Sequence, residues 1–363
     1  MNSRLTIRSL SARPVDVPMK RPLQTSGGLV GTAPLVVVDL ETEEGITGSA
    51  YVFCYTLVAL EPVAHLIRNL ETSIKGNEVA PLVLEQKLQQ RFRLLGPQGL
   101  TAIAMAGIDM AAWDALAKAS SLPLARLLGG EDRPIPAYNS CGLGIIGPER
   151  AAEEARELAA GGFRAVKIRL GYPDLKTDLA VVRAVRRAVG DSMLLMTDYN
   201  QCLTVPEAIH RARALDQEGV YWIEEPVLAT DYAGHARIAA ETATPIQIGE
   251  NWWGPHDMAK SVAASASDFV MPDAEKIGGV TGWLRAAALA ESHGLPVSSH
   301  LLPEISAHLL AVSPTCHWLE YVDFADPILE EPLRIEDGNA VPFRAPGIGF
   351  KFDQDAIRRY AVG

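Results

Sequence analysis

The chain has 363 residues, is 48% hydrophobic, and carries a formal net charge of −11 at pH 7 with an isoelectric point near 5.3. This length is enough for one large or two moderate domains, and the acidity argues against nucleic acid or an anionic membrane as a main partner. The four cysteines form no CxxC pair, the N-terminus has no apolar signal segment, and no apolar run reaches 18 residues. We therefore expect a cytoplasmic protein with reduced thiols and no membrane span.

The first part of the chain, residues 1–128, is expected to form an α+β domain. Two β-rich runs are followed by helical patterns, at residues 5–17, 33–53, 58–73, 83–94 and 101–120. Strands followed by helices without alternation favour an α+β arrangement over a parallel sheet. The Gly- and Pro-rich stretch LLGGEDRPIP that follows is typical of a domain boundary.

From this boundary to about residue 325, short apolar strands alternate with helical patterns. Eight strands are predicted, in IPAYNS, AVKIRL, LLMTDYN, VYWIEE, PIQIGE, DFVMPD, PVSSH and HWLEYV. Eight strand–helix units predict an α/β fold of the (β/α)₈ TIM-barrel type, modified by the preceding capping domain. An open doubly wound sheet is the alternative, but no Gly-rich nucleotide turn follows the first strand. Residues 326–363 lack the repeat and are expected to pack back on the first domain.

The active site of such a barrel lies at the carboxyl ends of its strands, and these ends are strongly polar here. One or two polar residues could be turn formers or helix caps, but a succession of ionisable side chains is not explained in that way. We therefore expect a catalytic centre in the barrel mouth. Its candidate residues are Ser140, Lys167, Arg169, Asp198, Asn200, Glu224, Glu250, Asp273, His300 and Glu320.

Three of these candidates are carboxylates from three consecutive strands: Asp198, Glu224 and Glu250. They would repel one another in a cleft, and ligation by oxygen alone favours Mg²⁺ or Mn²⁺ over zinc as the ion that relieves the repulsion. Neutralisation by Lys167 and Arg169 is the alternative, since strand alternation points both cations to one face. That arrangement leaves three negative charges for two positive ones.

Asp273 and His300 lie at the ends of the sixth and seventh predicted strands. An aspartate beside a histidine fixes the imidazole tautomer and raises its basicity, so the pair is a candidate general base. A Ser–His–Asp hydrolase is disfavoured because no GxSxG motif occurs. The stretch KIGGVTGW is only loosely similar to a phosphate loop, and a βα turn explains its glycines equally well.

Taken together, these residues resemble the mandelate racemase subgroup of the enolase superfamily. The stretches GTAPLVVVDL, AGIDMAAWDALAK, WIEEP, GENWWGP, KIGGVTGW and SSHL look like this subgroup, and the similarity covers nearly the whole chain. The resemblance implies Mg²⁺-dependent removal of the proton next to a carboxylate, through an enediolate that fixed positive charge stabilises. It also implies a small-molecule carboxylate as substrate and a homo-oligomer, in particular an octamer.

By this resemblance, Asp198, Glu224 and Glu250 would hold Mg²⁺, with Asn200 beside them, and the carboxylate and α-hydroxyl of the substrate would chelate the metal ion. Other residues would contact the substrate carboxylate. These are Lys167, Ser140 and Glu320, the last as a protonated acid whose pKa is raised by burial and neighbouring charge. Lys276, which opens KIGGVTGW, is a further candidate for substrate binding.

The bases show one departure from the family pattern. His300, oriented by Asp273, would remove the proton on one face of the α-carbon, and a second lysine would act on the other face. This chain has Arg169 at that second position. Because a guanidinium releases its proton far less readily than an ammonium, three outcomes are open. Arg169 would act as a slow base, or serve only as electrostatic support, or the enzyme would be a dehydratase.

The substrate substituent is expected to face a loop of the first domain, RPLQTSGGLVGTAPL. Five side chains form its expected apolar surroundings: Leu23, Val30, Phe53, Tyr55 and Leu301. Such a lining suits an aryl or alkyl group better than several hydroxyls, unless these residues only pack the domain interface. We therefore expect a racemase or epimerase of an apolar 2-hydroxy acid. An acid-sugar dehydratase is the alternative, and an inactive protein of this fold is least favoured.

Overall fold

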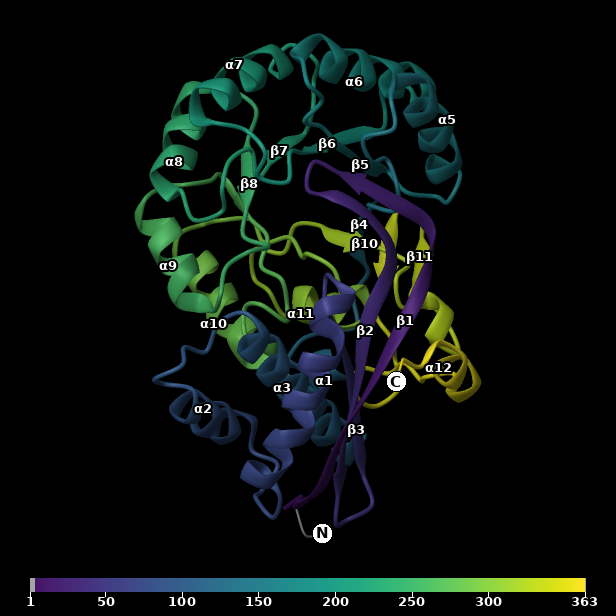
Figure 1. Cartoon of the computed structure of the whole chain (residues 1–363), viewed down its shortest axis with the longest axis vertical. Helices are drawn as coiled ribbons and strands as arrows, with labels where there is room; N and C mark the ends of the chain where they lie inside the picture. The colour runs from purple at the N-terminus through teal and green to yellow at the C-terminus, as the bar shows by residue number, and fades with distance from the viewer. Residues whose placement is uncertain (1–3, 363) are drawn as a thin grey trace.

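The computed structural model describes residues 4–362. Its first domain is built on a three-stranded antiparallel sheet of β1 (Ile7–Thr25), β2 (Gly28–Thr42) and β3 (Thr47–Phe53), in that order. The strands β1 and β2 pair almost to the turn, where Thr25 faces Gly28, and form one long hairpin. Figure 1 shows this hairpin leaving the sheet and reaching the barrel.

Two helices pack on this sheet, α1 (Leu57–Ile74) and α3 (Leu100–Ala119), and α2 (Pro81–Arg91) packs against α3 instead. The Ala-rich α3 approaches β3 closely, and the lack of a side chain at Gly48 permits this. A Cβ at Gly48 would lie 2.8 Å from the backbone nitrogen of Ala115. By length and composition α3 could cross a membrane, although no such apolar run was expected. However, 83% of its most apolar window is buried inside the protein, so burial between the sheet and the barrel accounts for its composition.

The expected barrel is confirmed. Six parallel strands pair in chain order, and β10 closes the ring by pairing in parallel with β4. The seventh predicted strand forms only isolated bridges, of Val297 with Val270 on one side and Cys316 on the other, and of His300 with Asp273. The strands are β4 (Ile135–Asn139), β5 (Ala165–Arg169), β6 (Leu194–Asp198), β7 (Trp222–Glu224), β8 (Ile246–Ile248), β9 (Phe269–Val270) and β10 (Leu319–Tyr321).

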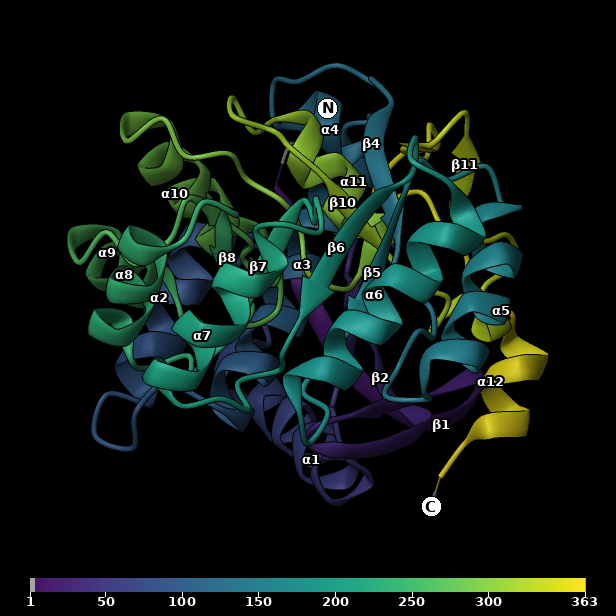
Figure 2. The same ribbon diagram turned by 90° about the horizontal axis from the view of Figure 1, so that it is seen from above.

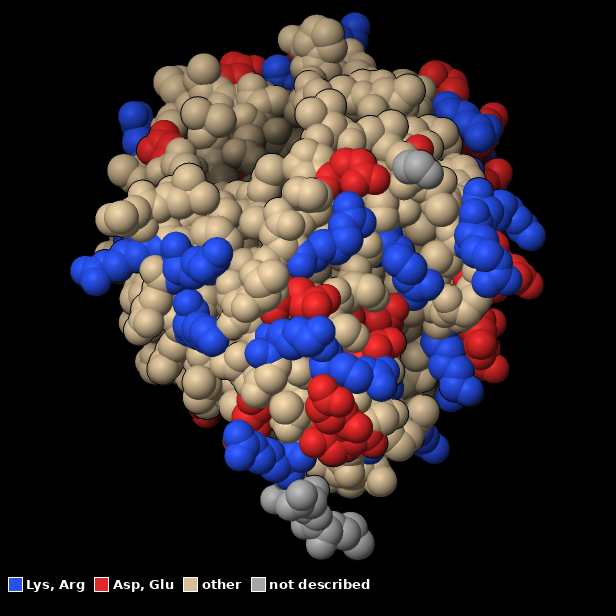
Figure 3. Space-filling model, turned by 60° about the horizontal axis from the view of Figure 1, so that its bottom comes forward, with Lys and Arg blue, Asp and Glu red and all other residues tan. Residues whose placement is uncertain are grey.

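Helices surround the barrel, as the view in Figure 2 shows. They are α5 (Pro148–Ala159), α6 (Leu175–Val189), α7 (Val205–Leu215), α8 (Tyr232–Glu241), α9 (Pro255–Ala263), α10 (Gly279–Ser292) and α11 (Pro303–Ala311), and the short α4 (Leu124–Leu127) precedes the first barrel strand. On the surface, basic and acidic side chains are interspersed over the face seen in Figure 3.

An apolar layer inside the barrel lies directly beneath the site. It consists of Tyr138, Ala165, Met196, Trp222 and Met271, all fully buried. Each of these residues comes two positions before a polar candidate, so strand alternation points both to the barrel interior in successive layers. The apolar layer thus closes the bottom of the site and leaves the strand ends as its polar layer.

The last residues of the described chain contact both the barrel and the first domain. The strands β11 (Arg334–Glu336) and β12 (Asn339–Val341) form a hairpin that extends the sheet beside β4. Further on, the Ile348 amide donates to the Asp114 carboxylate of α3 at 2.6 Å, and α12 (Gln354–Tyr360) lies against β1. The division of the chain at residues 128 and 325 stays a prediction.

The tip of the β1–β2 hairpin lies on the barrel mouth. The Ile145 amide donates to the Gln24 carbonyl at 2.7 Å, and the Ser26 hydroxyl donates to the Tyr199 carbonyl at 3.2 Å. These contacts anchor the tip to the loops that follow β4 and β6. The half of the mouth formed by β4, β5 and β6 is therefore covered by the first domain.

Candidate active site

Three carboxylates converge at the ends of neighbouring strands. Asp198 and Glu224 are direct partners in the β6–β7 ladder, and Glu250 follows β8 by two residues. Each residue offers an oxygen within 4.8 Å of the other two, and all three side chains are largely buried. The parallel ladder thus places on one side of the barrel mouth three acids that are far apart in the sequence.

This triad fits a hard divalent cation. Burial raises the pKa of Glu224 well above its ordinary range, Lys167 opposes this rise, and Asp198 and Glu250 add to it. The cluster therefore holds more negative charge than its protein neighbours neutralise. An all-oxygen donor set with excess negative charge suits Mg²⁺ or Mn²⁺, and a bound ion would supply the missing positive charge.

Lys167 lies at the centre of the acids. Its ammonium nitrogen is 2.5 Å from Glu224 Oε1, 2.8 Å from Glu320 Oε1 and 3.4 Å from Asp198 Oδ2. Burial alone would lower the pKa of Lys167, but these three carboxylates outweigh it and raise the pKa above its ordinary value. Lys167 is therefore held as an ammonium.

Glu320 differs from the expectation that its carboxyl group is protonated. Burial acts to raise its pKa, but Lys167, followed by His300 and Arg169, outweighs burial and lowers the pKa below its ordinary value. Its Oε2 accepts a hydrogen bond from the Leu301 amide at 2.8 Å. In this arrangement Glu320 is an ionised acceptor, because the lysine expected to contact the substrate already pairs with it.

Arg169 points inward like Lys167, yet its guanidinium is held at the end of β4. Its Nη1 donates to the carbonyls of Ser140 and Gly142, both at 2.9 Å, and its Nη2 donates to the Ser140 hydroxyl at 2.7 Å. Among the described residues, its buried Nε has no hydrogen-bond partner and lies 4.0 Å from Asp198 Oδ2. Arg169 therefore fixes the Ser140 loop and presents one free N–H to the acids.

Asp273 and His300 form the expected pair, with Nδ1 2.7 Å from Asp273 Oδ2. The other imidazole nitrogen, Nε2, is 3.3 Å from Glu250 Oε2, so the ring faces the triad. Burial lowers the pKa of His300, but the carboxylates of Glu250, Glu320 and Asp273 outweigh it and raise the pKa. Tyr55 joins the pair, because its hydroxyl donates to Asp273 Oδ2 at 3.2 Å.

A second polar network links Glu250 of the triad to Lys276 through two residues that were not among the candidates, Asn251 and Glu225. The amide nitrogen of Asn251 donates to Glu250 Oε1 at 3.0 Å and to the buried Glu225 at 2.7 Å. The amide oxygen of Asn251 accepts from the Lys276 ammonium at 2.7 Å. Glu225 could have been found because it directly follows Glu224 in the stretch WIEEP. Nothing in the sequence distinguished Asn251 from an ordinary loop residue.

The remaining candidates lie around these groups. Asn200 turns back to Asp198, with its backbone and side-chain nitrogens 2.8 and 3.0 Å from the two carboxylate oxygens. Leu23 and the half-buried Val30 face each other across the hairpin near its tip. Phe53 is buried, and its amide donates to Glu275 at 2.8 Å. The structure thus brings the polar candidates into one cluster, whereas Leu23 and Val30 reach it only as part of the covering hairpin.

Comparison with known families agrees with this geometry. Residues 8–129 match the mandelate racemase / muconate lactonizing enzyme N-terminal domain, and residues 150–356 match the enolase C-terminal domain-like family. The chain belongs to the mandelate racemase subgroup of the enolase superfamily. Enzymes of this superfamily use Mg²⁺ for proton abstraction, and Asp198, Glu224 and Glu250 form a group that could hold this ion.

Relatives within the superfamily carry out different reactions. The 3,6-anhydro-alpha-L-galactonate cycloisomerase of Streptomyces coelicolor is 32% identical over 352 residues, 96% of this chain and 97% of the relative. The L-talarate/galactarate dehydratase of Salmonella typhimurium is 29% identical over 350 residues, 94% of this chain and 88% of the relative. A crystal structure of an enolase from Bradyrhizobium complexed with magnesium and mandelic acid is 43% identical, covers 100% of both chains and has a TM-score of 0.96. Membership of the enolase superfamily therefore does not determine which reaction this chain catalyses.

Proposed function

We propose that this enzyme dehydrates a 2-hydroxy acid that also carries a hydroxyl on its β-carbon. The observation that carries the proposal is the arrangement of the two cations on β5. Arg169 donates three hydrogen bonds from its terminal nitrogens to Ser140 and Gly142, and Lys167 is held as an ammonium by three carboxylates. Among the described residues, His300 is then the base that faces the triad. One base suits elimination better than inversion of a stereocentre, which needs a base on each face.

In this proposal the carboxylate and α-hydroxyl of the substrate lie at the acidic triad. A bound Mg²⁺ would stabilise the negative charge that develops on the carboxylate when the α-proton leaves. His300 takes this proton at Nε2, while Asp273 and Tyr55 keep its ring in place. His300 then returns the proton to the β-hydroxyl, the C–O bond breaks and water leaves. The enol that results rearranges to a 2-keto acid.

Racemisation of an apolar 2-hydroxy acid is the second candidate. Three buried side chains, Leu23, Phe53 and Leu301, favour an aryl or alkyl substituent. The similar enolase from Bradyrhizobium was solved with mandelic acid, which belongs to this substrate class. In this case Arg169 would have to exchange a proton despite its three hydrogen bonds, and we rank this function second for that reason.

The experiment is a deuterium-exchange assay in D₂O with Mg²⁺, followed by NMR. Dehydration predicts that sugar acids yield 2-keto acids, and that each enantiomer of mandelate either exchanges without inversion or does not exchange. Racemisation predicts inversion of both mandelate enantiomers, with deuterium at the α-carbon. Inversion of both enantiomers without a 2-keto product from any sugar acid would contradict the proposal.

The matched variant for this assay is His300→Asn, which keeps a hydrogen-bonding side chain but removes the base. We expect α-proton exchange to fall by about 10³-fold or more, since general-base catalysis contributes about 10²–10⁴-fold. Mg²⁺ affinity, measured by titration, should stay close to that of the unmodified enzyme. If exchange persists in His300→Asn, another group is the base.

A further inference from the structure

Trp222 lies in the apolar layer beneath the acidic triad, but its one polar group is directed at the triad. It belongs to β7 and comes two positions before Glu224, so strand alternation turns both side chains into the barrel. Trp222 is 0% exposed, and its indole Nε1 donates to Glu224 Oε2 at 3.0 Å. A buried N–H needs an acceptor, and the acceptor of this N–H is a triad acid.

Aromatic rings at the bottom of the barrel hold the indole in place. The ring of Tyr138 packs edge-on against it, with the centroids 5.3 Å apart and the planes at 85°. The centroids of His317 and Phe269 lie 6.1 and 6.5 Å from that of Trp222. Because a close-packed interior leaves no room for the ring to turn, the indole N–H is a donor of fixed position.

Glu224 is held by a donor at each of its two oxygens. Its Oε2 accepts from the indole, and its Oε1 accepts from the Lys167 ammonium at 2.5 Å. The ammonium lies on a flexible stem and also contacts Asp198 and Glu320. The indole has a rigid ring and a single acceptor, so it is the donor that fixes the orientation of this carboxylate.

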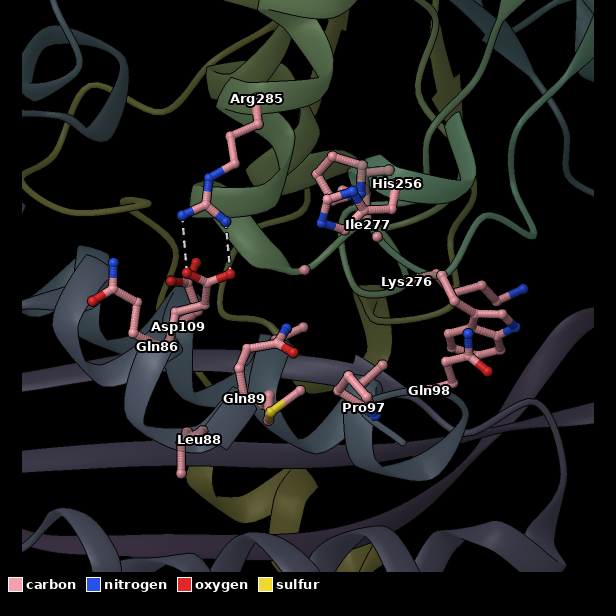
Figure 4. Close-up of a pocket in the computed structure, with 18 of the residues that line it drawn as sticks. Gln86, Leu88, Gln89, Pro97, Gln98, Asp109, His256, Lys276, Ile277 and Arg285 are labelled. Atoms are coloured by element: carbon pink, nitrogen blue, oxygen red, sulfur yellow. Dashed lines mark hydrogen bonds and ion pairs between the residues drawn. The ribbon is translucent and has the colours of Figure 1, made fainter. Parts of the chain in front are cut away.

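The other two triad acids are held by loop residues at the rim of the barrel. Asp198 accepts from the backbone and the side chain of Asn200, which follows β6. Glu250 accepts from Asn251, which in turn accepts from Lys276. In Figure 4, Lys276 lies at one end of the cavity between the first domain and the barrel. These supports therefore lie at the edge of the barrel, whereas the indole lies inside it.

We propose that Trp222 is a positioning residue that fixes the carboxylate of Glu224 and so makes the triad selective for Mg²⁺ over Ca²⁺. Mg²⁺ requires near-ideal octahedral geometry, whereas Ca²⁺ takes about six to eight oxygens in flexible geometry and often binds both oxygens of one carboxylate. A carboxylate of fixed orientation suits Mg²⁺, and loss of the indole donor frees Oε2 for Ca²⁺. The inference holds for dehydration and for racemisation, because both reactions use the metal ion.

The test is titration of the full-length enzyme with Mg²⁺ and with Ca²⁺, by calorimetry after chelation of bound metal and without substrate. Trp222→Phe keeps a buried aromatic ring but removes the N–H. We expect its Kd for Mg²⁺ to rise about tenfold or more, since residues that support metal ligands contribute about 10–100-fold to affinity. Its Kd for Ca²⁺ should change by about threefold or less, because Ca²⁺ tolerates a mobile carboxylate. An unchanged ratio of the two constants would overturn the inference.

Trp283→Phe is the matched control. Trp283 is also 0% exposed, and its indole donates at 3.0 Å to the Ser313 hydroxyl, which is not part of the triad network. This variant loses the same ring volume and a hydrogen bond of the same length, so it should lower the melting temperature and leave the ratio of the two constants unchanged. An equal shift of the ratio in both variants would mean that loosening of the fold is the cause, and the inference would fail.

An isosteric analogue tests the N–H without a change of volume, also in the case that Trp222→Phe does not fold. The amino acid β-(3-benzothienyl)alanine keeps both rings of tryptophan and has sulfur in place of the N–H. Within residues 4–362, indole N–H groups donate from Trp113, Trp222 and Trp283, and that of Trp222 ends on a triad acid. Enzyme with the analogue at all six tryptophans should show the ratio shift expected of Trp222→Phe. The ratio of the unmodified enzyme in this protein would contradict the role of the N–H.

Discussion

The guanidinium of Arg169 is held in a fixed position and retains its proton, so it stays positively charged. Its three hydrogen bonds end on two carbonyls and one hydroxyl of the Ser140–Gly142 segment, so it stabilises the loop after β4 and adds positive charge to the acids. A guanidinium must lose a proton before it can act as a base, and the hydrogen bonds that both terminal nitrogens donate oppose that loss. The lysine of the family pattern would be a shorter donor and a better base.

Arg169→Lys tests this difference directly. We expect exchange of the α-proton at the His300 face to fall about tenfold, because the loss of the fixed donors costs about 1.4 kcal/mol of transition-state stabilisation. Exchange at the opposite face of the α-carbon should increase, since a lysine can release and accept a proton. The measurement is deuterium incorporation into each mandelate enantiomer. Unchanged exchange at both faces would show that Arg169 has neither role.

Tyr55 acts on the base through Asp273. Burial, followed by the charges of Asp273 and Glu275, raises the pKa of Tyr55 well above its ordinary value, so its hydroxyl stays a donor. Tyr55→Phe removes a 3.2 Å hydrogen bond from Asp273 and should lower kcat about threefold to tenfold with little change in KM. Steady-state kinetics of dehydration measure both constants.

The matched control is Tyr51→Phe, which removes a similarly buried hydroxyl that donates to Glu304 at 2.5 Å, away from the triad. This control should lower the melting temperature and leave kcat within about twofold. If both variants lower kcat equally, the effect of Tyr55 is one of stability and Tyr55 does not position the base.

At the level of whole elements, the covering hairpin depends on close backbone contact with the barrel. A Cβ at Gly144 would lie 2.5 Å from the carbonyl oxygen of Gln24 and 2.8 Å from its amide nitrogen. The Gly144→Ala variant should therefore displace the hairpin tip from the mouth. We expect KM to rise about tenfold and hydrogen exchange to increase in the segment that links β1 and β2.

Gly31→Ala is the control, because Gly31 belongs to the same hairpin and a Cβ there meets nothing within 4 Å. Its KM and its hydrogen exchange should match those of the unmodified enzyme. Equal behaviour of the two variants would mean that the hairpin does not gate the site.

The sequence predicted the elements better than their contacts. Period-two alternation identified the inward face of β5, and the alternation of strands and helices identified the barrel. The seventh strand was predicted as regular, but it forms only isolated bridges at Val297 and His300, because pairing there depends on neighbouring strands. The acceptors of Arg169 include the carbonyls of Ser140 and Gly142, which every residue type possesses. A sequence carries no signal for backbone acceptors, so this contact could not be predicted.

Over the whole molecule, His308 joins three parts of the chain. It lies on α11, its Nδ1 accepts from the Ala125 amide of α4 at 3.3 Å, and its Nε2 donates to the carbonyl of Ile348 at 2.9 Å. The bond from the Ala125 amide requires the neutral imidazole, because a protonated Nδ1 cannot accept it. Burial lowers the pKa of His308 from 6.5 to about 4, because a charged ring here would lose solvation.

The pH dependence of stability follows from this shift. Between about pH 6.5 and pH 4 the unfolded chain binds a proton at His308 and the folded protein does not, so its contribution to stability is complete above pH 6.5 and is lost as the pH falls through this window. The loss amounts to about 3 kcal/mol, at about 1.4 kcal/mol for each pKa unit. His308→Gln keeps one donor and one acceptor but does not titrate. Urea unfolding of both proteins at intervals from pH 7 to pH 4 should therefore show a free-energy difference that shifts in favour of the variant as the pH falls. Parallel curves would mean that His308 is already protonated in the folded protein, or that it is not the group that couples these three segments to pH.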